Sequence, residues 1–273
     1  MGENRTPSAD KMPRFDFKHC SHMIRIFLAE MIGLGVVCFM VMIYQNGPVA
    51  GPIVVGLAFT WVAWVFGPIS GAQVNPAVTL ALFLTRRLSV VYTIICLLAQ
   101  MIGAMAGAWI GKIAGPAAYA SNNTLGLTLR NPDISSGQAV GLEMLGTGLL
   151  ILCVLGMLDE FRAPIWAQGH VTIFPFAFGV TQALVACLIG GLTGSSLNPA
   201  RSLGPAIVNQ NFTEIWIYIV GPIVGGLLAA ILYEMVLSDA ASLPRLKAWF
   251  THADFDRTKD YQEEDRNMAD TAL

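Results

Sequence analysis

The chain has 273 residues, of which 55% are hydrophobic and 12% are charged, whereas a soluble domain carries roughly a quarter charged residues. Eight of the charged residues lie in residues 1–25 and 13 lie in residues 239–273, which leaves 13 for the 213 residues between. The net charge of −2 gives no basic field for phosphates, so we expect no nucleic-acid partner. The composition excludes a soluble protein and indicates the lipid bilayer as partner.

Six long apolar stretches are expected to cross a membrane. An α-helix needs about 20 apolar residues to span a hydrocarbon core of roughly 30 Å. The stretches of sufficient length are about 22–45, 50–67, 88–114, 137–157, 170–190 and 213–237. Two shorter stretches, 75–85 and 198–208, give about 16 Å of helix each, or half a membrane. We therefore predict an all-α membrane protein with six transmembrane helices and two half-helices.

The chain repeats itself. Ala-Glu-Met-Ile-Gly around Glu30 is echoed by Leu-Glu-Met-Leu-Gly around Glu143, and the segment 70–77 is echoed by 193–200. Each copy, at about 22–114 and 137–237, holds three spans, so the second copy is predicted to be inverted relative to the first. Short half-membrane segments at matching places of inverted repeats indicate a polar pathway between them. The segments 1–21 and 239–273 are expected to lie outside this domain.

Basic residues beside the spans predict the orientation. One set of loops and ends carries Arg14, Lys18, Arg25, Arg86, Arg87, Arg162, Arg245 and Lys247. The opposite loops carry Arg130, with Lys112 near the end of the third span. Both termini are therefore predicted to be cytoplasmic, and the polar first twenty residues do not resemble a cleaved signal peptide. The sequon that begins at Asn122 then lies outside and is a candidate glycosylation site. A second sequon, at Asn211, is too close to the sixth span for us to expect occupancy.

Asn-Pro-Ala begins both short segments, as Asn75, Pro76, Ala77 and as Asn198, Pro199, Ala200. Asn is a strong N-cap and Pro suits the first helical turn. A helix that begins at bilayer depth leaves unpaired N–H groups and a partial positive charge, and it is tolerated only where it is buried in protein or lines water. We expect the two Asn ends to meet near the midplane, each capping its own helix and offering its amide N–H groups to a permeant. One Asn-Pro alone is typical of a turn; two matched copies favour a pore.

With these motifs the chain resembles the aquaporin, or major intrinsic protein, family over about residues 22–238. The resemblance rests on Glu30, Glu143, the segment Ser-Gly-Ala-Gln-Val-Asn-Pro-Ala-Val-Thr at 70–79 and Asn-Pro-Ala-Arg-Ser-Leu-Gly-Pro-Ala at 198–206. It implies six tilted helices plus two half-helices, a pore in each subunit, a homotetramer and a multi-pass protein of the plasma membrane. We expect no enzymatic activity and no cofactor or metal, because no nucleophile or metal-ligand cluster converges at pore depth.

The family has a second constriction outside the Asn pair, formed by four positions. Counting from the motifs carries them onto Val55, Ala186, Ser195 and Arg201. Water-selective members usually have a large aromatic residue first and His second. Val and Ala at these places predict a wider constriction with one apolar wall, and in this the chain resembles the insect glycerol-permeable aquaporins. We therefore expect water, glycerol and urea as permeants. If the register differs by a turn, Phe59 or Trp61 refills the space. At Ser202 and Ala206, in contrast, the chain resembles the water channels, since the glycerol channels of the family carry Asp and Lys at these positions.

The remaining charges within the spans have assigned roles. Arg201 is expected to donate hydrogen bonds to the solute and, with the two positive helix ends, to exclude protons and cations. Glu30 and Glu143 are expected to brace the half-helix loops, with a proton relay as the alternative. The small-residue runs at 103–111 and 221–230 are predicted packing faces. A pH sensor at His170 is a minor alternative.

Other functions stay open at this point. The chain resembles a strictly water-selective aquaporin in part, or a poorly conducting relative with an adhesion or junctional role. A coupled transporter would need Glu30, Glu143 or Glu234 at a substrate site. The tail beyond residue 239 is expected to be solvated, with a trafficking partner as the alternative.

Overall fold

The computed structural model describes residues 20–44, 50–159, 170–252, 254–257 and 259–262. Six helices in these ranges are long and apolar enough to cross a membrane. They are α1 (Cys20–Ile43), α2 (Gly51–Ser70), α4 (Val90–Ala114), α6 (Ser136–Met157), α8 (His170–Thr193) and α10 (Ile217–Leu232), the last extended by a π-helical turn, η2 (Tyr233–Leu237). The predicted all-α architecture with six spans is confirmed. Arg14, Lys18, Arg162, most of segment 1–21 and the side chain of His170 lie outside the described residues.

The two predicted half-helices are α3 (Pro76–Leu84) and α9 (Pro199–Asn209). Each begins at the Pro of its Asn-Pro-Ala motif with the Asn as N-cap. Ser89 and Ser135 cap α4 and α6 in the same way, through their side-chain oxygens. The sixth span begins at Ile217 and not at 213, because the backbone before it forms turns closed by the bonds Ile215 N to Phe212 O and Ile217 N to Glu214 O. Two further short helices are α5 (Ala118–Ser121) and α11 (Leu243–Thr251).

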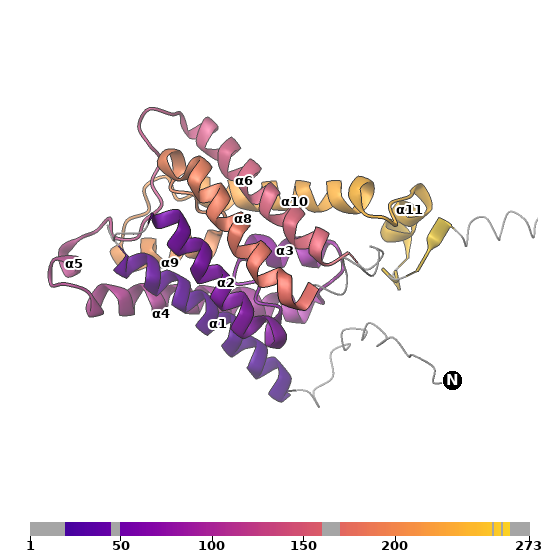
Figure 1. Ribbon diagram of the computed structural model, residues 1–273, viewed down its shortest axis with the longest axis horizontal. Coiled ribbons are helices and arrows are strands. Elements are labelled where there is room, and N and C mark those ends of the chain that lie inside the picture. Colours follow the sequence, from indigo (N-terminus) through magenta and orange to yellow (C-terminus); the bar gives the residue numbers. More distant parts are fainter. Residues whose placement is uncertain (1–19, 45–49, 160–169, 253, 258, 263–273) are drawn as a thin grey trace, which may run out of the picture.

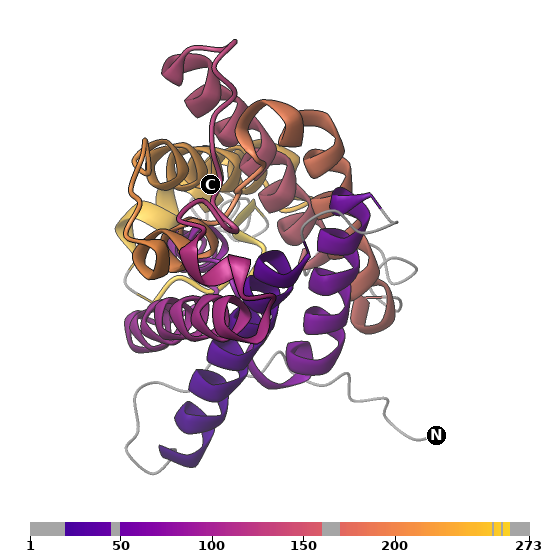
Figure 2. The same ribbon diagram turned by 90° about the vertical axis from the view of Figure 1, so that its left-hand side faces the viewer.

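The long helices pack side by side in the order α4, α1, α2, α8, α6, α10. The α1–α4 contact of the first repeat is matched by the α6–α10 contact of the second, and α2 meets α8 between the repeats. Each half-helix packs against the last long helix of the other repeat, α3 on α10 and α9 on α4. Figure 1 shows α11 and the start of α1 at one end of the bundle and α5 at the other, and Figure 2 views it from the α5 end.

Glycines allow the long helices to approach closely. A Cβ added to Gly107 would lie 1.9 Å from the carbonyl oxygen of Gly35, and one on Gly225 would lie 2.1 Å from that of Met144. Both distances are far below any van der Waals contact, so only glycine fits the α1–α4 and α6–α10 crossings. The packing role predicted for the small-residue runs is confirmed at these positions.

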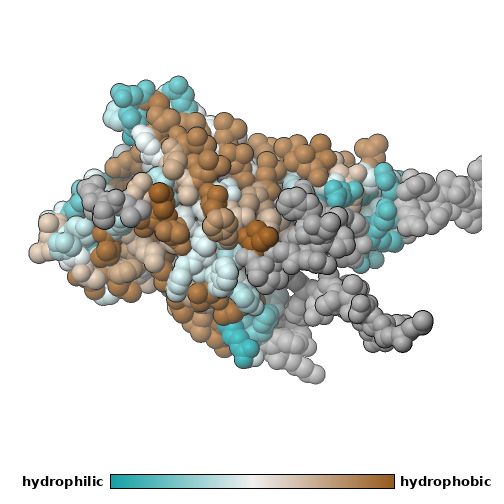
Figure 3. Space-filling model, viewed as in Figure 1, coloured by the Kyte–Doolittle hydropathy of each residue, from teal (hydrophilic) through white to brown (hydrophobic). Residues whose placement is uncertain are grey.

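The outer surface of the helices is apolar. Large hydrophobic side chains such as Leu57, Leu98 and Leu188 are more than half exposed. Figure 3 shows apolar residues over most of the visible helical face, with hydrophilic residues gathered toward the ends. An apolar surface that extends over most of the helices would favour aggregation in water and suits contact with lipid.

The end of the bundle that holds α11 contains a cluster of charges. Glu234 forms salt bridges with Arg87 and Arg245, and all three side chains are 10% exposed or less. Arg86 donates to the carbonyls of Trp249 and His252. The expectation of a solvated tail therefore does not hold for α11, because its backbone carbonyls and Arg245 hold it against the bundle.

Candidate functional site

Glu30 holds the loop that leads into α3. Its Oε1 accepts hydrogen bonds from Ser70 Oγ and Gln73 N, and its Oε2 accepts from Val74 N and Gln100 Nε2, all at 2.6–3.0 Å. The residue is fully buried on α1. A carboxylate can accept hydrogen bonds from several donors at once. Glu30 therefore satisfies backbone N–H groups of this loop that have no partner within a helix.

Glu143 makes the matching contacts in the second repeat. Oε1 accepts from Thr193 Oγ1 and Ser196 N, and Oε2 accepts from Leu197 N, at 2.7–2.9 Å. Each donor lies 123 residues after its counterpart in the first loop, since Ser70 corresponds to Thr193 and Val74 to Leu197. These are the contacts that the predicted bracing role requires.

Both loops have the same left-handed backbone at non-glycine residues. Ala72 and Val74 have φ of 45° and 40°, and their counterparts Ser195 and Leu197 have 45° and 54°. Such conformations cost of order 1–3 kcal/mol each and persist only where the surroundings impose them. The buried carboxylates supply that constraint, because they bind the N–H groups of these same segments.

The two capping asparagines are joined across the repeats. Asn75 Nδ2 donates to Leu197 O at 2.8 Å, and Asn198 Nδ2 donates to Val74 O at 2.7 Å. Their Oδ1 atoms cap the helices, accepting from Ala77 N in α3 and from the first N–H groups of α9. One N–H of each amide is thus used between the loops, because two inverted loops place a carbonyl opposite each amide. The predicted offer of amide N–H groups to a permeant then rests on the second N–H of each.

Two cavities lie on opposite sides of this asparagine pair. The first, which we call the Arg201 cavity, has a volume of about 370 Å³ and includes Ser196, two residues before Asn198. The second, the Gln73 cavity, has about 570 Å³ and includes Gln73, two residues before Asn75. The helix α2 contributes its first half to the Arg201 cavity and its last half to the Gln73 cavity. The two cavities therefore lie toward opposite ends of α2, one on each side of the asparagine pair.

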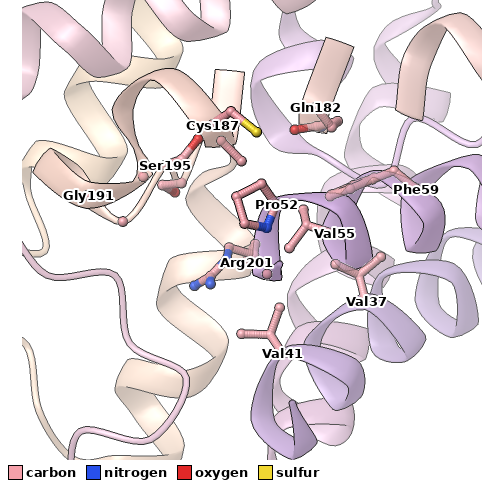
Figure 4. A pocket seen from close by; sticks show the side chains of 15 residues that line it. Val37, Val41, Pro52, Val55, Phe59, Gln182, Cys187, Gly191, Ser195 and Arg201 are labelled. Carbon is pink, nitrogen blue, oxygen red and sulfur yellow. The ribbon is translucent and has the colours of Figure 1, made fainter. Parts of the chain in front are cut away.

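All four residues carried over from the family constriction line the Arg201 cavity: Val55 from α2, Ala186 from α8, Ser195 from the second loop and Arg201 from α9. Figure 4 shows Val55, Pro52 and Arg201 around the same space, with Ser195 across from Val55. One wall is formed by small apolar side chains and the other by a guanidinium and loop backbone. Phe59 also lines the cavity, deeper than Val55, whereas Trp61 is half exposed on the outer face and contributes nothing to it.

The connector between the repeats holds Arg201. Its Nη1 donates to the carbonyl of Gly126 at 3.0 Å, and the buried Thr128 shares a hydrogen bond with Ser202 on α9. The connector, residues 115–135, has no periodicity that predicts this role. The only local signal was Gly126 itself, which has φ of 68° and so marks a turn that glycine favours.

An ion pair outside the spans joins the connector to the loop between α9 and α10, from Arg130 to Glu214. Glu214 accepts from Ser136 Oγ and from Arg130 Nε, the latter at 2.8 Å. These hydrogen bonds hold the pKa of Glu214 below its ordinary value of 4.5. Asn122, the candidate glycosylation residue, lies on the same side and accepts from Thr124 N and Oγ1.

The carboxylates that a coupled transporter would need are engaged elsewhere. Glu30 and Glu143 bind the loops, and Glu234 is paired with two arginines at the α11 end. None of the three lines either cavity. This arrangement removes the candidates for ion coupling within the described residues.

Comparison with known proteins agrees with this geometry. The model of the major intrinsic protein family matches residues 17–233. Aquaporin-1 from Bos taurus and Aquaporin FA-CHIP from Pelophylax lessonae are each 38% identical over 196 residues, which cover 71% of this chain and 70% of each relative. The X-ray structure of the aquaglyceroporin from Plasmodium falciparum matches with a TM-score of 0.70 and 25% identity, covering 79% of this chain and 97% of that one. Six membrane-length helices, two half-helices with facing asparagines and these likenesses together make the chain a member of the major intrinsic protein family, whose members are passive channels and not enzymes.

Proposed function

We propose that the chain is a channel for water and for small neutral solutes such as glycerol and urea, and that it excludes protons and ions. Val55, Ala186, Ser195 and Arg201 form its selectivity filter in this proposal. The observation that carries it is the lining of the Arg201 cavity, where the small apolar residues Val55 and Ala186 lie together with Ser195 and Arg201.

A filter of this composition suits a molecule with two faces. The carbon skeleton of glycerol can lie against Val55 and Ala186, while its hydroxyl groups bond to Arg201 and to loop carbonyls. Selectivity in pores depends on diameter and on lining groups of this kind. Urea and water satisfy the same polar wall. The wider opening lets the larger solutes enter without losing water.

Exclusion of ions follows from the helix ends. The N-termini of α3 and α9 meet at Asn75 and Asn198, and each carries a partial positive charge. Arg201 adds a full charge at the filter. A cation or a hydronium ion meets a positive potential along the whole inner path, and no described carboxylate on the path offsets it.

The relatives support both halves of this proposal. The matched Aquaporin-1 proteins favour water conduction, and the matched aquaglyceroporin favours a solute of the glycerol class. Strict water selectivity is the second candidate, favoured by Ser202 and Ala206. The size of the two filter residues decides between them in our proposal.

The assembly and its orientation complete the proposal. The α11 end is cytoplasmic, because Arg86, Arg87 and Arg245 gather there. The α5 end then faces outside, with Asn122 available for glycosylation. A homotetramer in the plasma membrane is the form expected of the family.

The test is stopped-flow permeability of proteoliposomes that contain the purified chain. Wild type should conduct water, glycerol and urea. Ala186→His should lower glycerol and urea permeability by about tenfold while changing water permeability less than about threefold, because it narrows the filter. Ala186→Ser, which adds little volume, is the matched control. Water flux without solute flux in wild type refutes the wide filter, and no flux at all favours an adhesion or junctional role.

A further inference from the structure

Gln182 is a polar residue in the middle of the apolar helix α8. Its side chain is 3% exposed and lines the Arg201 cavity. Its Nε2 has no hydrogen-bond partner among the described residues. Figure 4 shows the carboxamide at the edge of the pocket, between Cys187 and Phe59.

The position of Gln182 along α8 puts it at the inner end of the cavity. Ala186, one helical turn later, lines the same cavity, whereas Phe178, one turn earlier, lines the Gln73 cavity. On α2 the residue at the matching depth is Phe59, one turn below Val55. Gln182 therefore stands between the filter and the asparagine pair, facing a wall that is otherwise apolar.

An unpaired buried amide needs a partner. Burying a donor without a hydrogen bond costs of the order of a full desolvation penalty, and buried polar groups in folded proteins are almost always satisfied. The cavity beside Gln182 is about 370 Å³, and a water molecule occupies only about 30 Å³ of liquid. Whatever fills this cavity can reach the amide, so its partner is supplied from the permeation path.

We propose that the Gln182 carboxamide is an additional solute-binding group of the channel, one turn below the filter, that bonds small polyols and amides as they pass from Arg201 to the asparagine pair. The carboxamide both donates and accepts, so it matches the hydroxyls of a polyol and the N–H and carbonyl groups of urea. The proposal rests on the solute conduction proposed above and adds the residue that favours solute over water.

The experiment compares wild type, Gln182→Met and Leu184→Met in proteoliposomes. Methionine is unbranched and similar in length to glutamine but gives no amide. Leu184 is on the outward face of the same helix, 53% exposed, so its variant controls for the substitution in α8. We measure water, glycerol and urea permeability for each, together with the melting temperature in detergent.

The expected result is a fall in the glycerol-to-water and urea-to-water permeability ratios of about two- to tenfold in Gln182→Met, the range of one ordinary hydrogen bond. Leu184→Met should leave both ratios unchanged. The melting temperature of Gln182→Met should not fall, because the Nε2 group makes no hydrogen bond to the described residues; a fall would indicate a structural role and overturn the proposal.

Two further outcomes separate this inference from the proposed function. If wild type conducts glycerol and the ratios do not change in Gln182→Met, the role of Gln182 is wrong while the proposed function stands. If wild type conducts water but neither glycerol nor urea, the proposed function fails, and the solute-binding role of Gln182 fails with it.

Discussion

The Asn75 amide donates a hydrogen bond to the carbonyl of Leu197, 122 positions further along the chain, at 2.8 Å. The mirror bond, from Asn198 to Val74, is 2.7 Å long. Each asparagine thus caps one half-helix and ties its end to the loop of the other. The centre of the channel is held by side chains from both repeats, so its geometry depends on both being in place.

Asn75→Ala should destabilise the fold strongly. It removes an N-cap, worth about 1 kcal/mol, and leaves the buried carbonyl of Leu197 unpaired, which costs about 1–3 kcal/mol. We expect a loss of about 2–4 kcal/mol in the free energy of unfolding, measured by denaturant titration in detergent. Asn123→Ala, at an exposed residue, should change little. Equal stability of the two variants would contradict the bridging role.

Glu143→Gln should be poorly tolerated although it changes a single atom. Both carboxylate oxygens face a backbone N–H, those of Ser196 and Leu197, so either orientation of the amide points its NH2 group at a donor. The loss should reach about 3 kcal/mol, in the range for a buried charged acceptor. Glu30→Gln should behave alike, because its oxygens face Gln73 N and Val74 N. Thermal melting of both purified variants measures the effect, and a wild-type melting temperature in either would exclude bracing.

Gly107→Ala should force α1 and α4 apart. The new methyl would lie 1.9 Å from the carbonyl oxygen of Gly35, and overpacking costs about 1–3 kcal/mol or more. Gly141 on α6 has nothing within 4 Å of an added Cβ, so Gly141→Ala is a matched control that should gain roughly 0.5–1 kcal/mol from reduced backbone freedom. The yield of folded protein and the melting temperature distinguish the two. Similar behaviour would contradict close packing as the reason for glycine at 107.

Glu214 makes the loop at the α5 end sensitive to acid. Hydrogen bonds from Ser136 and Arg130 lower the pKa of Glu214 below 4.5, so the ionised form is favoured in the folded state. This contribution is fully present above pH 4.5 and is lost as the pH falls through the lowered pKa. The melting temperature of wild type should therefore fall further than that of Glu214→Gln when the pH is lowered from about 5 to about 3. Parallel curves for the two proteins would show that the carboxylate is not engaged.

Phe255 should fix the segment after α11. Its ring lies under the guanidinium groups of Arg86 and Arg245, at 5.6 and 5.3 Å, and stacks on Tyr261. Cation–π contacts of this kind are worth about 0.5–2 kcal/mol each. Phe255→Leu should increase cleavage of the tail in limited proteolysis. Phe250→Leu, at a residue that is 71% exposed, is the control and should cleave like wild type.

Local signals in the sequence predicted the half-helices well. Asn followed by Pro fixes a helix start through capping and a preset φ, and both α3 and α9 begin there. The glycine runs predicted the faces through which helices contact one another, because the absence of Cβ in an apolar span allows a neighbouring helix to approach closely. These features depend on neighbouring residues, which the sequence contains directly.

Contacts between distant segments could not be predicted in the same way. The bond from Arg201 to Gly126 joins a half-helix to a connector without periodicity. The use of one asparagine N–H between the loops follows only from their facing arrangement. Gln182 could have been noted as an amide one turn from Ala186, but its meaning depends on which face of α8 lines the cavity.

The crossed packing of the half-helices determines how the protein can be assembled during synthesis. The segment that becomes α3 leaves the ribosome long before α10, the helix against which it packs. Until the second repeat is made, the carbonyl of Val74 has no Asn198 to bond to, and Glu30 holds the first loop from within its own repeat. The first repeat therefore lacks these contacts until the second repeat is inserted. The contacts at the channel centre are complete only when α10, the last long helix, is in place.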